Sequence, residues 1–290
     1  DGKETTEPQL EWKDAKSDDC VTVELLGAPG LLKVSNDVFV VAEAQCKEKD
    51  QENTFTGIAS QLLKTEDSNT PVDVLGDAKS KTQILEDKGS AKVKKMDVSR
   101  PTTVTKESEV YMLVGRYSGT PGASGQDNVA DDSGLLLVTG KVSGEEASNK
   151  KIDWKSNTAL PRTIVGAQHN SLTGLVGGGG SGIETKDGKL VFPVEGTKKG
   201  NTETDVKSVS LIIRSSDAES WTLSNEIPAD GCSDPSVVEW KDGKLMMMTA
   251  CDDGPRRVYE SGDKGDSWTE ALGTLSRVWG NKQGGEAKGV

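Results

Sequence analysis

The sequence predicts an all-β chain built from repeated four-stranded units, the arrangement of blades in a β-propeller. Three observations predict it. A Ser-x-Asp-x-Gly-x-Ser-Trp turn lies between two strand-like runs near the C-terminus. Hairpins with Asp-Gly or similar turns recur along the chain, and helical periodicity is scarce. The 290 residues, 33 of them glycine, are enough to bury a substantial core.

We expect four blades after a polar, flexible N-terminal arm at residues 1–20. The propeller segment as a whole covers residues 21–275, and residues 276–290 begin the next connection between blades. The expected blades are residues 21–80, 92–160, 164–226 and 229–275.

The C-terminal turn carries a motif known as the Asp box, which is found in the outer hairpins of propeller blades. Asp263 can accept hydrogen bonds from backbone N–H groups two residues further on. Gly265 supplies a positive φ, and Trp268 re-enters the next strand as a large apolar side chain whose indole N–H needs a partner. We expect these residues to stabilise the turn rather than to act in catalysis. The motif consists of Ser261, Asp263, Gly265, Ser267 and Trp268.

Two weaker copies of this turn precede it. Residues 214–222 lack one residue and the glycine, and form a degenerate Asp box. Residues 65–71 retain only the aspartate, Asp67. The degenerate box consists of Ser215, Asp217, Ser220 and Trp221.

Hairpins fill the units between these turns. One spans residues 31–43, a second turns at Asp187-Gly188, and a third turns at Asp242-Gly243. Asp-Gly between two apolar runs is the strongest short-range hairpin signal. The third hairpin places the run Met246–Met248 in a packed strand rather than in a ligand site.

Charge and composition exclude several classes of partner. The formal net charge of −12 argues against nucleic acid and against anionic membrane surfaces. No apolar run is long enough for a transmembrane helix. The polar start carries no signal peptide, so either a signal was removed or the sequence begins inside a longer protein. His169 is the only histidine, and we expect no metal and no cofactor.

The four cysteines give an indication of compartment. Cys232 and Cys251 flank the third hairpin, so antiparallel pairing would place them opposite each other within disulfide reach. The alternative is two separate buried thiols. Cys20 and Cys46 lack this symmetry, and their pairing stays open. This cysteine usage suits an extracellular protein, at the cell surface or secreted.

Four stretches resemble the trypanosomal trans-sialidase superfamily: residues 96–102, 110–115, 231–235 and 258–280. The resemblance extends over about residues 20–285. It implies a six-bladed sialidase-like propeller, of which about four blades lie in this chain. In that superfamily a lectin-like β-sandwich follows the propeller. Some members transfer sialic acid, and most are inactive surface glycoproteins that adhere to host cells or modulate immunity.

The resemblance also locates the positions of a sialidase site. Such a site needs three arginines that clamp the substrate carboxylate, an acid/base aspartate, and a tyrosine nucleophile activated by a glutamate. The first and second arginine positions are Gly27 and Ala250 here. The acid/base aspartate becomes Glu43, a substrate-contacting aspartate becomes Arg100, and the activating glutamate becomes Asp234. The third arginine and the tyrosine would lie beyond residue 290. We therefore predict a catalytically inactive site.

Two hypotheses of function remain. The first is an inactive surface protein of the adhesin branch, which binds host-cell surface or matrix proteins and glycans and reaches a membrane only through a lipid anchor outside this chain. The alternative is an active exo-α-sialidase or trans-sialidase acting on terminal sialic acids. The missing arginines favour the first. Arg256 and Arg257 are either a contact for an anionic glycan or a solvated strand end.

The glycine-rich run at residues 177–182 has more than one interpretation. It resembles a linker or a phosphate cradle, but no Gly-Lys-Ser/Thr follows it, which excludes a P-loop. The family resemblance favours the start of a strand whose backbone passes close to the propeller centre. Four blades of six would leave two open faces, filled by further blades, a second copy or a partner.

Overall fold

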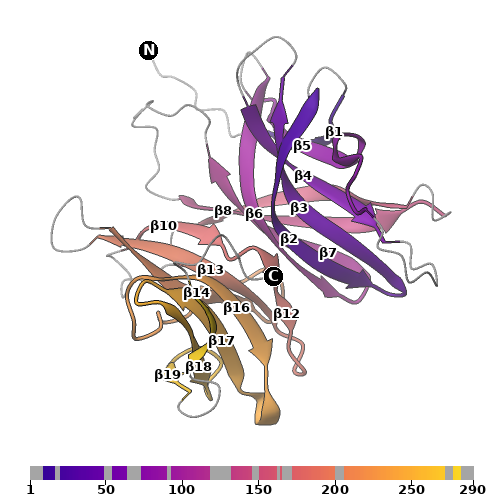
Figure 1. The fold of residues 1–290 in the computed structure, drawn as a ribbon. Coiled ribbons are helices and arrows are strands. Elements are labelled where there is room, and N and C mark those ends of the chain that lie inside the picture. The colour runs from indigo at the N-terminus through magenta and orange to yellow at the C-terminus, as the bar shows by residue number, and fades with distance from the viewer. Residues whose placement is uncertain are drawn as a thin grey trace, which may run out of the picture.

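Alternating apolar residues separated by turn residues fold this chain into strands almost throughout (Figure 1). The computed structural model describes residues 9–16, 20–48, 54–63, 73–89, 93–117, 132–145, 150–161, 164, 172–199, 206–271 and 277–281. The all-β prediction is confirmed, and the few helical turns in these ranges are short 3-10 segments such as Ala78–Lys81 and Lys241–Gly243. The third Asp-box copy at residues 65–71, and His169, lie outside these ranges.

The N-terminal half forms one continuous ladder of antiparallel strands, in the order β2-β3-β4-β5-β6-β7-β8-β9. Because β5 pairs with both β4 and β6, two successive four-stranded groups share this ladder. The strands are β2 (Thr22–Val34), β3 (Asp37–Lys47), β4 (Thr54–Leu62), β5 (Thr82–Asp87), β6 (Lys94–Lys106), β7 (Glu109–Tyr117), β8 (Asp132–Ser143) and β9 (Lys151–Pro161).

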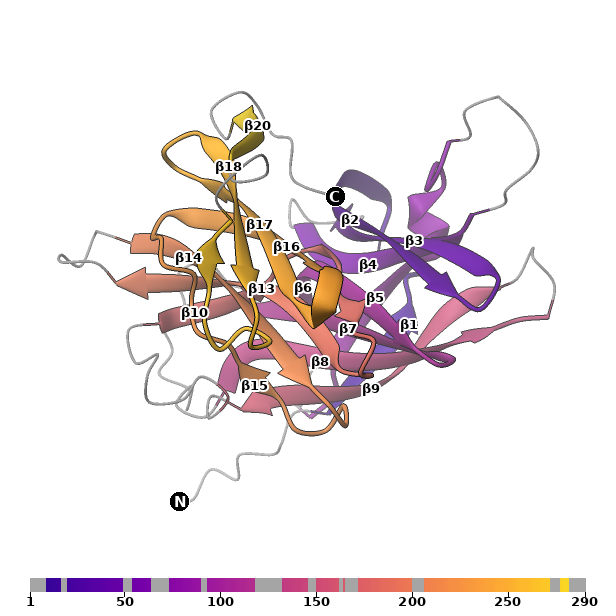
Figure 2. The same ribbon diagram turned by 90° about the horizontal axis from the view of Figure 1, so that it is seen from below.

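Two further sheets follow, in the orders β10-β13-β14-β15 and β16-β17-β18-β19. Figures 1 and 2 show these orange and yellow strands beside the indigo and magenta ladder, in an arrangement that does not close into a ring. Their strands are β10 (Leu172–Gly177), β12 (Ile183–Glu184), β13 (Leu190–Lys199), β14 (Val206–Ser215), β15 (Thr222–Leu223), β16 (Cys232–Glu239), β17 (Leu245–Cys251), β18 (Pro255–Ser261), β19 (Thr269–Glu270) and β20 (Arg277–Asn281). Between β10 and β12, the short strand β11 (Gly180–Ser181) pairs with β6 of the first sheet.

The predicted hairpin turns have the backbone that their residues favour. Asp242 and Gly243 both have positive φ, 61° and 71°, between β16 and β17. This is the combination that a two-residue hairpin turn needs. Gly188, in the turn before β13, has φ 79°.

Apolar clusters join each group of strands to the next. One cluster packs β2–β5 against β6–β9, with Val41 and Met112 among its members. A second joins the ladder to the third sheet group through Leu113 and Phe192. A third joins β13 and β14 to the last sheet through Ile212 and Tyr259. The groups therefore pack face to face in chain order, as propeller blades do.

The N-terminal segment differs from the flexible arm that the sequence analysis predicts. Leu10–Asp14 forms β1, which pairs antiparallel with β5. Trp12 is buried, and its indole N–H donates to Asn157 Oδ1 at 2.5 Å. Leu10 and Trp12 alternate with charged residues, and this period of two was the overlooked strand signal.

The end of the described chain differs as well. Residues 277–281, expected to begin a connection between blades, form β20 and pair antiparallel with β18. The last sheet thus holds five strands rather than four.

Both pairs of cysteines form disulfides. Cys232 and Cys251 lie opposite each other on β16 and β17, with 4.0 Å between their Cα atoms, as predicted. Cys20 and Cys46, whose pairing the sequence left open, are bonded as well. Within the described ranges no helix has the length and apolar character needed to cross a membrane.

The two ends of the series of sheets expose large apolar side chains. On β2 these are Leu25, Leu26 and Leu31, and on the last sheet Val238 and Met248, with Trp240 just after β16.

Candidate functional site

The first strands of three groups carry a β-bulge at equivalent places. In β2, β6 and β16 the register shifts beside an Xaa-Pro pair: Ala28-Pro29, Arg100-Pro101 and Asp234-Pro235. The residue before each proline has a positive φ, of 44°, 51° and 51° respectively. Such a backbone is costly for residues other than glycine and concentrates at functional sites. The bulges redirect these side chains from the regular alternation of their strands.

The glycine-rich run supplies the corresponding stretch of the third group, between β10 and β11. A Cβ on Gly177 would lie 2.6 Å from the carbonyl oxygen of Arg100, and one on Gly178 would lie 3.0 Å from that of Pro235. Only glycine fits so close to two other backbones. This is the close approach that the family resemblance implies, and Gly180–Ser181 continues as β11, parallel to β6.

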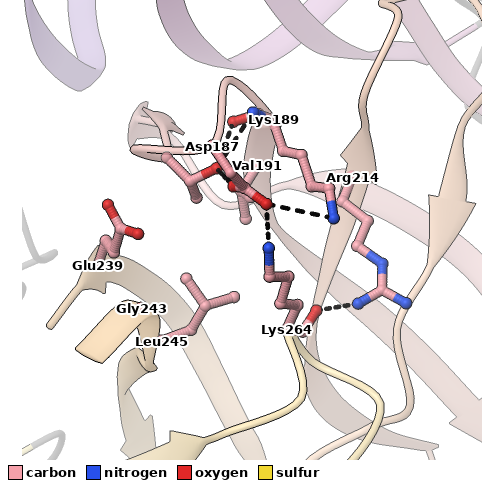
Figure 3. A pocket seen from close by; sticks show the side chains of 9 residues that line it. Asp187, Lys189, Val191, Arg214, Glu239, Gly243, Leu245 and Lys264 are labelled. Atoms are coloured by element: carbon pink, nitrogen blue, oxygen red, sulfur yellow. Dashed lines mark hydrogen bonds and ion pairs between the residues drawn. The ribbon is translucent and has the colours of Figure 1, made fainter. Parts of the chain in front are cut away.

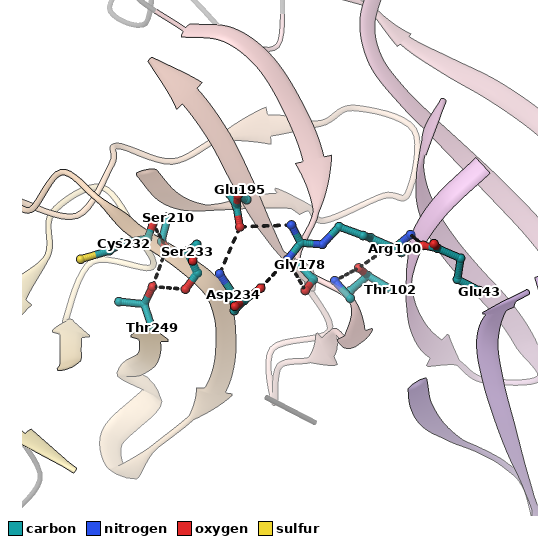
Figure 4. A network of polar contacts seen from close by, with 11 residues as sticks. Glu43, Arg100, Thr102, Gly178, Glu195, Ser210, Cys232, Ser233, Asp234 and Thr249 are labelled. Atoms are coloured by element: carbon teal, nitrogen blue, oxygen red, sulfur yellow. Dashed lines mark hydrogen bonds and ion pairs between the residues drawn. The ribbon is translucent and has the colours of Figure 1, made fainter. Parts of the chain in front are cut away.

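Arg100 is at the centre of the polar contacts where these strands meet (Figure 4). Its Nη1 donates to Glu195 Oε2 at 3.1 Å, and its Nη2 donates to Asp234 Oδ1 at 2.7 Å. Nη2 also lies 3.4 Å from the carbonyl oxygen of Gly178. We call Glu43, Arg100, Gly178, Glu195 and Asp234 the central site.

Glu43 holds the backbone of Arg100 rather than its side chain. Glu43 Oε2 accepts a hydrogen bond from the Arg100 N–H at 2.7 Å. Gly27 lies beside this carboxylate, since a Cβ on Gly27 would be 3.7 Å from Glu43 Oε1. The structure therefore brings four of the five family positions together: Gly27, Glu43, Arg100 and Asp234. Ala250 is buried on β17, opposite Ser233, the residue before Asp234.

Glu195 is the residue of this site that the sequence analysis missed. It lies in β13, and its Oε2 accepts from both the Arg100 guanidinium and the backbone N–H of Asp234, each at 3.1 Å. No local motif marks it. The available signal was a carboxylate following the apolar run Leu190–Val194, since a charge in a buried strand needs a partner.

A buried hydroxyl network fixes the strand that carries Asp234. Thr249 Oγ1 donates to the Ser233 carbonyl oxygen at 2.6 Å, and Ser210 Oγ donates to that of Cys232 at 3.0 Å. The two hydroxyls lie 2.7 Å apart. Asp234 is therefore presented from a rigid, disulfide-bonded hairpin.

The central site has an excess of negative charge. Glu195 and Asp234 pair with the one guanidinium, and Glu43 accepts from the Arg100 N–H, so three carboxylates and one guanidinium leave two negative charges uncompensated within the set. The side chains of Arg100, Glu195 and Asp234 are 24%, 15% and 26% exposed, so water screens them only in part. A ligand carboxylate would meet carboxylates here rather than arginines. Among the residues that the structure describes, no cluster of His, Cys, Asp and Glu suits a metal ion.

The Asp box lies away from this site, in the turn between β18 and β19. Asp263 Oδ1 accepts from the Ser261 hydroxyl at 2.7 Å and from the Ser267 N–H at 2.8 Å. Hydrogen bonds from Ser267, first from its hydroxyl, lower the pKa of Asp263 to about 2. Gly265 has φ 98°, and Trp268 is buried in the last core cluster. Its contacts are those of a structural turn.

The degenerate box forms the same kind of turn between β14 and β15. Asp217 Oδ1 accepts from the backbone N–H groups of Ser220 and Glu219 at 2.7 and 2.9 Å. These bonds, the Ser220 N–H first, lower the pKa of Asp217. Ser215 donates its hydroxyl to the same oxygen, and Trp221 packs on Phe192 with ring centroids 5.6 Å apart.

A small polar pocket joins the Asp box to the preceding sheet (Figure 3). Asp187 accepts hydrogen bonds from Lys264 and Thr185, and the contact with Lys264 is the main cause of its lowered pKa. Arg214 donates to the Lys264 carbonyl oxygen and pairs with Asp266. Every charge in these contacts is paired with an opposite charge within the chain. The pocket therefore has a structural role, in which it joins the sheet of β13 and β14 to the last sheet.

Arg256 and Arg257 lie on β18, opposite Ala250 and Thr249 of β17. Arg257 pairs with Asp253, which lies in the turn between β17 and β18. This intramolecular partner leaves no support here for a specific contact of Arg257 with an anionic glycan.

Comparison with known proteins gives consistent similarities. The family model of the BNR repeat-like domain matches residues 28–290. A sialidase of Trypanosoma cruzi is 35% identical over 187 residues, 62% of this chain and 15% of that protein. A sialidase of Clostridium perfringens is 31% identical over 170 residues, 58% of this chain and 42% of that protein.

Among solved structures, Trypanosoma rangeli sialidase in complex with the inhibitor DANA superposes with a TM-score of 0.63 at 28% identity. The match covers 89% of this chain and 40% of that one. The chain therefore spans less than half the length of the relatives cited here.

Proposed function

The chain belongs to the BNR repeat-like domain family, and from this premise we propose that it is a sialidase-like surface protein without sialidase chemistry, acting in host-cell adhesion or immune modulation. Its partners in this proposal are host-cell surface or matrix proteins and glycans. Its location is extracellular, which the two disulfides support.

One observation carries the proposal: the central site has lost the cations that would hold a sugar acid. Gly27 and Ala250 supply no guanidinium, and Arg100 is engaged by Glu195 and Asp234. Arginine clamps carboxylates because its planar fork matches them with two hydrogen bonds. A substrate carboxylate would here displace an internal ion pair and approach three carboxylates.

An active exo-α-sialidase or trans-sialidase is the second candidate. The matched relatives from Trypanosoma cruzi and Clostridium perfringens are named sialidases. Glu43 and Asp234 also keep carboxylates at two of the family positions. Against this candidate, the arginine that the structure describes at the central site is already paired with Glu195 and Asp234.

Hydrolysis of a fluorogenic sialoside separates the two candidates. We expect the purified chain to release no more 4-methylumbelliferone than a heat-inactivated sample, with a known sialidase as positive control. Transfer of sialic acid from the same sialoside to lactose is measured against the same heat-inactivated blank. Release above the blank that Asp234→Asn abolishes would establish the enzyme and overturn the proposal.

Binding is tested without assuming chemistry. We expect the chain to bind at least one component of a combined array of glycans and extracellular matrix proteins, with saturation. Glu43→Ala and Asp234→Asn then report whether the bound component uses the central site. Failure to bind any component of the array, or intact host cells, contradicts the adhesin proposal.

A further inference from the structure

We propose that Arg100 is an internal ligand of the central site: its guanidinium fills an acidic recess that, once emptied, binds small guanidinium compounds and rejects acids. The inference rests on the proposed function in one respect only, namely that it concerns the same central site. It explains what occupies the remodelled site in this chain.

The first step is the origin of the contacts. Arg100 extends from β6, whereas Glu195 belongs to β13, Asp234 to β16 and Gly178 to the segment after β10. Each end nitrogen of the guanidinium meets a different sheet (Figure 4). The side chain therefore lies between elements as a bound ligand would.

The second step is that the backbone of Arg100 is held without its side chain. Glu43 accepts from its N–H at 2.7 Å, and Thr102 Oγ1 lies 3.3 Å from its carbonyl oxygen. Gly177 packs against the same carbonyl. Truncating the side chain at Cβ leaves all three contacts, so the bulge survives while the recess empties.

The third step is that the acceptors are also fixed independently of Arg100. Glu195 Oε2 accepts from the Asp234 N–H at 3.1 Å. Asp234 follows Ser233, whose carbonyl is held by Thr249, and Cys232, which is in a disulfide. The emptied recess keeps the held Glu195 carboxylate, the Gly178 carbonyl oxygen and the Asp234 carboxylate on a backbone that is fixed without Arg100.

The fourth step is the chemistry of the occupant. Two partly buried carboxylates without a cation are unfavourable, because a charge out of water needs a partner. Their spacing is that which the two end nitrogens of one planar guanidinium span, at 3.1 and 2.7 Å. A compact ammonium lacks this fork. We therefore expect the emptied recess to bind methylguanidinium more tightly than methylammonium, and not to bind acetate.

The experiment compares wild type, Arg100→Ala and the triple variant Arg100→Ala/Glu195→Gln/Asp234→Asn. Thermal unfolding is recorded with methylguanidinium chloride in the millimolar range, with sodium chloride at matched ionic strength as control. We expect Arg100→Ala to unfold several degrees below wild type and to recover saturably with methylguanidinium. Wild type and the triple variant should not respond. A response equal in all three, or none in Arg100→Ala, overturns the inference.

A second measurement covers the case in which Arg100→Ala does not fold. In wild type, a held guanidinium exchanges its protons slowly and gives resolved Arg100 side-chain N–H signals in ¹H–¹⁵N spectra. We expect those signals to weaken in the single variants Glu195→Gln and Asp234→Asn. Fast exchange in wild type contradicts an internal ligand.

The inference and the proposed function fail separately. Sialoside hydrolysis by wild type would end the proposed function whatever methylguanidinium does. A missing methylguanidinium response would end the inference even if hydrolysis is absent and the array binding is as expected.

Discussion

The carboxylate of Glu43 on β3 accepts a hydrogen bond from the backbone N–H of Arg100 on β6 at 2.7 Å. A side chain of the first group of strands thereby fixes a bulge in the second. Arg100 adopts φ 51° before a proline, a backbone that needs such external support. At the position that the family resemblance assigns to an acid/base group, this chain has a structural acceptor.

Replacing Glu43 tests this role. Glu43→Ala leaves the Arg100 N–H without its partner and should lower the free energy of unfolding by about 1–3 kcal/mol. Glu43→Gln keeps an acceptor at the same reach and should retain most of the stability. Urea denaturation measures both. Equal stability of Glu43→Ala and wild type contradicts the assignment.

The glycine run offers a steric test. A Cβ on Gly177 would lie 2.6 Å from the Arg100 carbonyl oxygen and 2.8 Å from Thr102 Oγ1. Gly177→Ala should therefore destabilise the fold by about 1–3 kcal/mol, as overpacking does. Gly262→Ala is the matched control, because a Cβ there meets nothing within 4 Å. The prediction fails if both variants unfold at the same urea concentration.

The Asp box predicts a pH dependence. The folded-state pKa of Asp263, about 2, lies below the ordinary value of about 3.9. Its contribution is therefore complete above about pH 5 and is lost as the pH falls toward the folded-state pKa. Asp263→Asn should be less stable than wild type at pH 6, and the difference should shrink at pH 2. A difference in urea midpoint that does not change with pH would refute this.

The disulfides predict a loss of stability when they are removed. The Cys232–Cys251 and Cys20–Cys46 bridges close segments with sequence separations of 19 and 26 residues. Each should contribute about 3 kcal/mol by the loop-entropy relation. We expect Cys232→Ala/Cys251→Ala and Cys20→Ala/Cys46→Ala each to lower the melting temperature in the absence of reductant. Alkylation of unreduced wild type, followed by mass spectrometry, should add no label, and any labelled cysteine would count against the pairing.

The repeated hairpins were predictable because their signals are local. Asp and Gly both tolerate positive φ, so Asp242-Gly243 by itself indicates the turn conformation. In the Asp box, Asp263 supplies the hydrogen-bond acceptor of the turn in which it lies. The degenerate box shows how far such signals can be relaxed. Ala218 takes φ 63° in that turn, while Ser215 and Asp217 still make its hydrogen bonds.

The missed features depend on partners distant in sequence. The alternation in β1 is too short to be decisive alone, and its strand is fixed by pairing with β5, which lies far along the chain. Glu195 belongs to the central site because bulges in two other strands turn Arg100 and Asp234 toward it. The sequence marked Arg100 as a reversal of charge. Only the fold shows that the positive charge of Arg100 is paired with Glu195 and Asp234 within the chain.

The pairing of Leu85 with Met96 joins β5 to β6 and links the first two groups through backbone pairing, and β11 joins the third group to β6 in the same way, whereas among the described residues the last sheet pairs with no strand of another sheet. If the molecule is pulled from its two ends, we expect its sheets to unfold at different forces. We expect the last sheet to separate first, and the N-terminal ladder, with the third group attached to it through β11, to resist as a single mechanical unit.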